Sequence, residues 1–207
     1  MRILYIDTSS NYLYAAIAAE NKILSEVKKE FGHSLSEEAL PEIVELFTKT
    51  NLTPKDIGKI IVVNGPGSFT GIRIGITIAK VYAWSLNIPI TTISGLEAMM
   101  LSAPEGKIRV PMLDARRRYV FAAIYNEENE PILKPKHIQI DELNKELEKL
   151  SDYIIITNDE IDDYEETQPY NPDLLKIINY YKDKEAINPH AINPDYLKLT
   201  EAEESKL

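Results

Sequence analysis

The sequence from residue 65 to residue 75 reads Gly65-Pro66-Gly67-Ser68-Phe69-Thr70-Gly71-Ile72-Arg73-Ile74-Gly75, and it holds four of the 8 glycines in the chain. The β-branched, apolar run before it, residues 59–64, predicts a buried strand. The long apolar run after it, residues 72–86, predicts a buried helix. The local unit is therefore a strand, a glycine turn and a helix.

The glycine turn has two interpretations. Gly65 and Gly67 permit positive φ and close backbone approach, so the turn could bind a phosphate or another anion at the helix N-terminus. Alternatively, the glycines serve only a tight strand-to-helix connection. The spacing favours the second interpretation, because no Gly-Lys-Ser/Thr follows and Gly71 comes one residue late for a dinucleotide-binding loop.

The elements around this unit follow a recognisable order. Strands are predicted over residues 2–7, 12–19, 23–31, 59–64 and 88–93, and helices over 33–50, 72–86 and 94–102. The order β-β-β-α-β-α-β-α is that of a ribonuclease-H-like unit, the building block of actin-like ATPase folds. We therefore predict an α/β fold with a full first domain, residues 1–104.

The second half predicts a shortened copy of the same unit. Strands are predicted over residues 107–112, 119–125, 132–140 and 152–157, with a helix over 141–150. A truncated ribonuclease-H-like domain is thus expected over residues 105–207. It includes an acidic loop over 158–172, expected to be mobile, a helix over 173–184 and an extended tail.

Composition restricts the functions open to the chain. It has 207 residues and no cysteine, which excludes disulfides and thiolate metal sites and fits a cytoplasmic location. No apolar run reaches membrane-spanning length. The net charge is −10, and residues 141–207 hold 18 of the 33 acidic but only 7 of the 23 basic residues. Because nucleic-acid binding uses many basic phosphate contacts, we expect any contact of this chain with a nucleic acid to be indirect, through a partner.

Three kinds of active site were considered. An actin-like ATPase or small-molecule kinase needs two phosphate loops and an adenosine-binding segment. Asp7-Thr8-Ser9 could supply the first loop and Asp114 the second. However, no glycine follows Gly106, so the close backbone approach that the second loop and the adenosine segment need is missing. A two-metal nuclease needs a carboxylate after the fourth strand, where the chain has Asn64, a poor ligand for a hard metal.

A metal-dependent enzyme of this superfamily would carry Asn-His-Leu-Glu-Gly/Ala-His after the fifth strand, where two histidines four residues apart hold one metal. The chain has Ser94-Gly95-Leu96-Glu97-Ala98-Met99 there. Gly95 and Met99 supply no nitrogen ligand, so no metal site is predicted. We interpret the chain as a non-catalytic subunit of an enzyme complex.

Five segments together resemble the TsaB (YeaZ) family, which takes part in making threonylcarbamoyladenosine in tRNA. They are Asp7-Thr8-Ser9, the region from His33-Ser34 to Leu40-Pro41-Glu42-Ile43, the 65–75 string, Ser94-Gly95-Leu96-Glu97-Ala98 and Asp114-Ala115-Arg116-Arg117, with Pro194-Asp195-Tyr196-Leu197 near the end. The resemblance covers most of residues 1–125. It implies a scaffold or activating subunit that works with a catalytic TsaD-type subunit and a TsaE-type ATPase on the tRNA adenosine next to the anticodon.

The resemblance also implies where the partner binds. The family pairs through the first-domain helices, as a homodimer alone or with the catalytic subunit, with no intrinsic cofactor and a nucleotide only at that shared interface. The expected interface residues are Leu40, Ile43, Phe47, Phe69, Ile72, Arg73 and Ile76. A second interpretation is that the apolar ones among them face the sheet. If they form the interface, Arg73→Glu or Ile76→Asp should weaken pairing without unfolding. The alternative function is a stand-alone ATPase or kinase.

Overall fold

The computed structural model describes residues 1–198, which divide into two compact units. The first unit comprises residues 1–95 and 172–195, and the second comprises residues 96–171 together with residues 196–198. This division differs from the boundary predicted after residue 104 in one important respect. Residues 172–195, which we call the return segment, pack with the first unit.

The first unit is built on a five-stranded sheet in the order β3-β2-β1-β4-β5. Its strands are β1 (Arg2–Asp7), β2 (Tyr12–Ala19), β3 (Lys22–Glu30), β4 (Lys59–Val63) and β5 (Ile90–Ile93). The strands β1, β4 and β5 run parallel, whereas β2 and β3 are antiparallel to their neighbours. This is the ribonuclease-H-like arrangement predicted from the order of elements.

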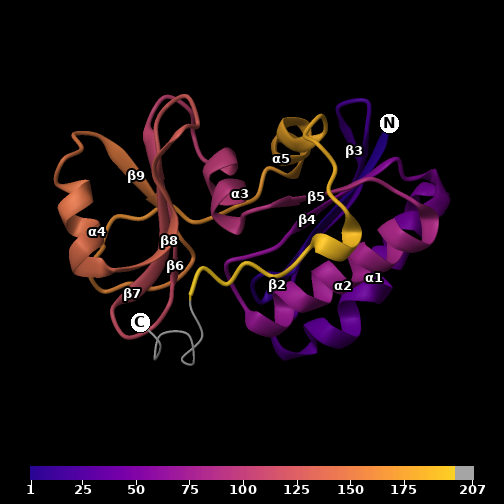
Figure 1. Cartoon of the computed structure of the whole chain (residues 1–207), viewed down its shortest axis with the longest axis horizontal. Coiled ribbons are helices and arrows are strands. Elements are labelled where there is room, and N and C mark those ends of the chain that lie inside the picture. The colour runs from indigo at the N-terminus through magenta and orange to yellow at the C-terminus, as the bar shows by residue number, and fades with distance from the viewer. Residues whose placement is uncertain (199–207) are drawn as a thin grey trace. The chain divides into compact units, whose positions relative to one another are not determined.

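Helices cover both faces of this sheet. They are α1 (Leu35–Thr50), α2 (Phe69–Leu86) and α5 (Leu174–Tyr181), with short 3-10 turns at Gly32–Ser34, Pro54–Asp56 and Pro189–Ala191. Figure 1 shows α1 and α2 on one side of the strands and α5 on the other. Residues 3–6 of β1 and all of β4 are consequently buried, which explains why their sequences are apolar without alternation.

Two helix starts differ from their predictions. The helix α2 begins three residues earlier than predicted, because the Ser68 hydroxyl accepts a hydrogen bond from Gly71 N at 3.2 Å and caps the helix. Ser34 is at the N-cap of α1, but its hydroxyl donates to the carbonyl of Phe31 at 2.9 Å instead of capping.

The second unit repeats the first in shortened form. Its strands are β6 (Ile108–Asp114), β7 (Tyr119–Tyr125), β8 (Pro131–Gln139) and β9 (Tyr153–Ile156), and its helices are α3 (Gly95–Ser102) and α4 (Ile140–Leu147). The sheet order β8-β7-β6-β9, with only β6 and β9 parallel, matches β3-β2-β1-β4. The predicted truncated copy is confirmed, without an equivalent of β5.

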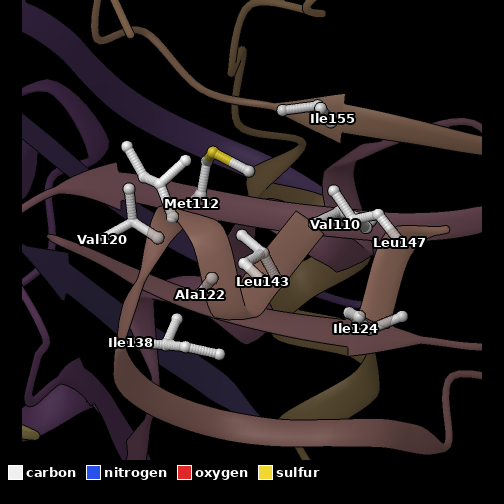
Figure 2. Close-up of a cluster of buried hydrophobic side chains, with 10 residues drawn as sticks. Val110, Met112, Val120, Ala122, Ile124, Ile138, Leu143, Leu147 and Ile155 are labelled. Atoms are coloured by element: carbon white, nitrogen blue, oxygen red, sulfur yellow. The ribbon is translucent and has the colours of Figure 1, made fainter. Parts of the chain in front are cut away.

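One apolar core holds the second unit together. Side chains of Val110, Val120, Ala122 and Ile124 on the sheet pack against Leu143 of α4 (Figure 2). Because side chains alternate across a strand, the intervening residues of β6 and β7, which include Leu113, Tyr119 and Phe121, lie on the opposite face of the sheet. The segment 158–172 after β9 contains no helix or extended strand.

The return segment is anchored to the first unit by lysine side chains. The Lys59 ammonium donates to the carbonyls of Tyr181, Lys182 and Lys184 at the end of α5, and burial lowers the pKa of Lys59. Lys80 of α2 donates to the carbonyl of Ile192 at 3.0 Å. The segment also adds a bridge beside the edge strand β5, between Ile90 and Ile187. Its residues therefore complete the first unit.

Candidate functional site: the glycine turn and the outer face of α1 and α2

The glycine turn is filled by the chain's own backbone. A Cβ atom at Gly67 would overlap the carbonyl oxygen of Ser9, and one at Gly71 would overlap that of Thr8. Hydrogen bonds hold this packing in place: Ser68 N donates to Ser9 O at 2.7 Å, and Thr8 Oγ1 donates to Gly71 O at 2.7 Å. The loop after β1 thus lies directly against the start of α2.

This packing favours the structural interpretation of the glycines. The first N–H at the start of α2, that of Ser68, points at a protein carbonyl oxygen, where a bound anion would otherwise sit. On the other side of the turn, Gly65 has a φ of +124° and faces the carbonyl of Asp195 in the return segment. Gly67 therefore lies against Ser9 and Gly71 against Thr8, and these contacts close the turn.

The two carboxylates predicted as remnants of phosphate loops both serve local turns. Asp7 is buried, and its Oδ1 accepts hydrogen bonds from Ser9 N at 2.8 Å and Ser9 Oγ at 2.7 Å. Asp114 belongs to the second unit, and its Oδ1 accepts from Arg116 N at 2.8 Å. Burial raises the pKa of Asp7 from its ordinary value, and the hydrogen bonds from Ser9 and Tyr5 oppose this shift only in part.

The raised pKa of Asp7 predicts a pH dependence of stability. Because the folded state holds this proton more tightly than the unfolded state, the contribution of Asp7 is most favourable below its unfolded pKa. That contribution falls as pH rises through the folded pKa. Asp7→Asn keeps the oxygen that Ser9 bonds, so the variant should gain stability over the parent as pH rises from about 4 to 7. Urea unfolding over this range measures the difference.

Asp56 offers a control in which the expected pH dependence of stability has the opposite sign. Hydrogen bonds from Thr53 N and Oγ1, both at 2.8 Å, lower the pKa of this exposed carboxylate. Asp56→Asn should therefore lose stability at neutral pH, and the loss should shrink as pH falls through the folded pKa. A stability difference for Asp7→Asn that does not change with pH, or that grows toward acid, would contradict the assignment of a buried, disfavoured charge.

The predicted position of a metal site in catalytic relatives carries no ligands. Gly95 begins α3, and Met99 is buried within it. Among residues 1–198, no group of three or more His, Asp or Glu side chains is placed to hold a metal ion. In the same part of the chain, none of the helices combines the length and hydrophobicity of a membrane span.

The helices α1 and α2 carry exposed apolar side chains. Five large ones are exposed, and we call them the helix surface: Leu40 and Val44 of α1, and Phe69, Val81 and Trp84 of α2. Trp84 is 68% exposed and Phe69 is 55% exposed. The two helices are in contact, with the rings of Phe47 and Tyr82 6.2 Å apart. An apolar patch of this kind on a soluble domain is typical of a protein-binding site.

The structure separates the predicted interface residues into two groups. Leu40, Phe69 and Arg73 lie on the outer face, and the Arg73 guanidinium lies 3.8 Å from the centre of the Phe69 ring. The other four are buried in the first unit and face the sheet, namely Ile43, Phe47, Ile72 and Ile76. They are core residues, which agrees with the second interpretation, in which the apolar residues face the sheet.

This correction changes one expectation. Ile76 is 4% exposed, so Ile76→Asp would bury an unpaired charge and unfold the unit instead of only weakening pairing. Val44, Val81 and Trp84 are also exposed on these helices, although the sequence analysis listed none of them as interface residues. The helical periodicity carries this information, because Val44, Val81 and Trp84 each lie on the side of their helix opposite the buried residues. Periodicity alone does not tell which side of an apolar helix faces the sheet.

Comparisons with known proteins agree on one family. The family model described as "TsaD: tRNA N6-adenosine threonylcarbamoyltransferase" matches residues 21–171. The tRNA threonylcarbamoyladenosine biosynthesis protein TsaB of Bacillus subtilis (strain 168) is 34% identical, with 98% of this chain and 96% of the relative covered.

Two further proteins are similar over much of the chain. The TsaB protein of Escherichia coli (strain K12) is 31% identical, over 70% of this chain and 69% of its own. The solved structure of YeaZ from Pseudomonas aeruginosa superposes with a TM-score of 0.73 and 20% identity, over 95% of this chain and 99% of that one. At that identity the superposition establishes a shared fold.

Proposed function

Because the chain belongs to the TsaB family of tRNA threonylcarbamoyladenosine biosynthesis proteins, we propose that it is the non-catalytic scaffold of the threonylcarbamoyl transferase. It binds and activates a TsaD-type catalytic subunit in the cytoplasm, and a TsaE-type ATPase joins that pair. The assembled complex transfers the threonylcarbamoyl group to the tRNA adenosine next to the anticodon.

The observation that carries this proposal is the helix surface. Five large apolar side chains on two adjacent helices favour a protein partner over a small ligand. The family model that matches this chain is described as the transferase itself, so the chain and the transferase are related in fold. A related partner presents equivalent helices, and the two can pair helix face to helix face. In the absence of that partner, a second copy of the chain occupies the same surface as a homodimer.

The glycine turn supports the absence of catalysis by this chain. In the glycine turn, the backbone of Thr8 and Ser9 lies against the N-terminus of α2, where an anion would otherwise bind. The chain therefore needs no cofactor of its own, and any nucleotide belongs to the interface with the catalytic subunit. The acidic residues 141–207 leave most of the tRNA binding to the partner.

Reconstitution from purified proteins tests the proposal. Transfer of the threonylcarbamoyl group to a tRNA transcript should require this chain together with the TsaD-type and TsaE-type proteins. The chain alone should show no transfer, no ATP hydrolysis and no tight ATP binding by calorimetry. Full activity without the chain, or robust turnover by the chain alone, would overturn the proposed function.

A further inference from the structure

The connection between β6 and β7 has an unusual backbone. Three consecutive arginines, Arg116, Arg117 and Arg118, have φ angles of +68°, +53° and +61°. Together they form one left-handed turn, closed by a hydrogen bond of 3.0 Å from Tyr119 N to Arg116 O. We call these three residues the arginine turn. Asp114 begins the turn by accepting a hydrogen bond from Arg116 N.

The arginine turn is held in a conformation that its side chains disfavour. Left-handed backbone is unfavourable for residues with a Cβ atom, and glycine, asparagine or aspartate are the usual residues there. Glycine at these positions would relieve the strain. We therefore expect the arginine side chains to make contacts that glycine could not make.

Two of the three side chains have partners within the chain. Arg118 contacts Asp163 through both terminal nitrogens, at 3.0 and 3.2 Å, and Asp141 at 2.9 Å. It thereby fastens the turn to α4 and to the segment after β9. Arg116 lies 3.4 Å from the Asp114 carboxylate. These contacts account for both residues as parts of the local structure.

Arg117 is different. Its side chain is exposed, and no hydrogen bond, ion pair or ring contact joins it to any residue in the range 1–198. The anchored residues on either side hold it at the tip of the hairpin. A strained backbone that presents an unpaired guanidinium to solvent indicates a contact outside this chain.

The neighbouring side chains indicate the kind of contact. The rings of Tyr119 and His137 stack in parallel, with centroids 4.5 Å apart, and both are partly exposed. Phe121 lies beside His137 at 5.3 Å. A guanidinium can bind a phosphate with two hydrogen bonds, and Arg117 precedes the partly exposed Tyr119 ring by two residues on the same hairpin. Proteins use arginine together with aromatic rings to bind RNA.

We propose that Arg117 binds a backbone phosphate of the tRNA when the transferase complex is assembled. This rests on the proposed function, since it assumes that the complex acts on tRNA. The partner still supplies most of the binding, and Arg117 adds a single contact from the second unit. The carboxylates of Asp114, Asp141 and Asp163 confine that contact to one site, because they neutralise the arginines on either side.

The test uses the reconstituted complex and an unmodified tRNA transcript. Arg117→Gly and Arg117→Glu should each raise the KM for tRNA about tenfold and change kcat less than about twofold, as expected for loss of one charge-assisted contact. The slope of log affinity against log salt should fall by about 1. The Tm of Arg117→Gly should also rise by about 2–4 °C as the strain is relieved.

Lys145→Glu is the matched control. Lys145 is exposed on α4 and its replacement changes the net charge by the same amount as Arg117→Glu, but the KM for tRNA should stay unchanged. An unaltered KM in both Arg117 variants would overturn the proposal. So would a loss of affinity for the catalytic subunit with tRNA binding intact, which would assign Arg117 to a protein contact. Full activity in the absence of the chain would instead refute the proposed function.

Discussion

Replacing Phe69 and Trp84 together with glutamate should abolish association with the TsaD-type subunit. Both side chains are largely exposed on α2, so the change removes two aromatic contacts and places two charges in the proposed interface. Large aromatic residues at the centre of an interface commonly contribute about 2–4 kcal/mol each, so affinity should fall by roughly a thousandfold or more. Calorimetric titration with the catalytic subunit measures the loss, and the reconstituted transfer activity should fall with it.

The same double variant should remain folded. Exposed positions on a helix tolerate polar residues, and the Tm should change by no more than about 2 °C. Ile132→Glu provides the matched control, since Ile132 is an exposed aliphatic residue on β8 and outside the helix surface. That variant should bind the partner normally. Normal binding by the Phe69 and Trp84 variant as well would show that the partner docks elsewhere.

A methyl group at Gly71 should destabilise the first unit severely. The Cβ atom of Gly71→Ala would overlap the carbonyl oxygen of Thr8. That backbone has little freedom to move, because Thr8 Oγ1 donates to the carbonyl of Gly71 and Ser9 O accepts from Ser68 N. We expect a loss of about 3 kcal/mol or more, at the upper end of overpacking effects. Thermal and urea unfolding measure it, and the expected fall in Tm is roughly 6–12 °C.

Gly95→Ala distinguishes this effect from a general cost of replacing glycine. The Cβ atom at Gly95 would lie 3.4 Å from the carbonyl oxygen of Pro66, an ordinary contact distance. Its Tm should therefore stay close to that of the parent protein. If Gly71→Ala were equally stable, the glycine turn would have room above it, and a small anion could enter where we describe packed backbone.

Much of the architecture could be predicted from the sequence. Continuous apolar runs mark strands that are buried on both faces of a sheet, and period-3.6 patterns mark its covering helices, so β1, β2 and α1 were placed within a few residues. The order of those elements then limited the topology to one arrangement, and the repeat in the second unit followed from the same reasoning. The apolar run that predicted α2 begins at Ile72, whereas the Ser68 cap sets the start of the helix three residues earlier.

Other features depend on contacts that no local pattern reveals. The return segment joins the first unit because Lys59 and Lys80 reach its carbonyl oxygens over more than 100 residues of sequence. The sequence analysis considered Asp114 for a second phosphate loop and did not predict the arginine turn, since no arginine signals a left-handed backbone. Four of the seven residues expected at the interface are buried because apolar periodicity does not distinguish core from surface: Ile72 and Ile76 are as hydrophobic as Val81, and only the position of the sheet separates them.

The most direct test of the docking role is calorimetric titration of the unaltered chain with the purified TsaD-type subunit of the same cell. We expect saturable binding with a Kd in the micromolar range or tighter, as is typical of a specific interface with an aromatic centre. The binding should be competitive with self-association of the chain. Absence of binding at concentrations well above that range would contradict the account.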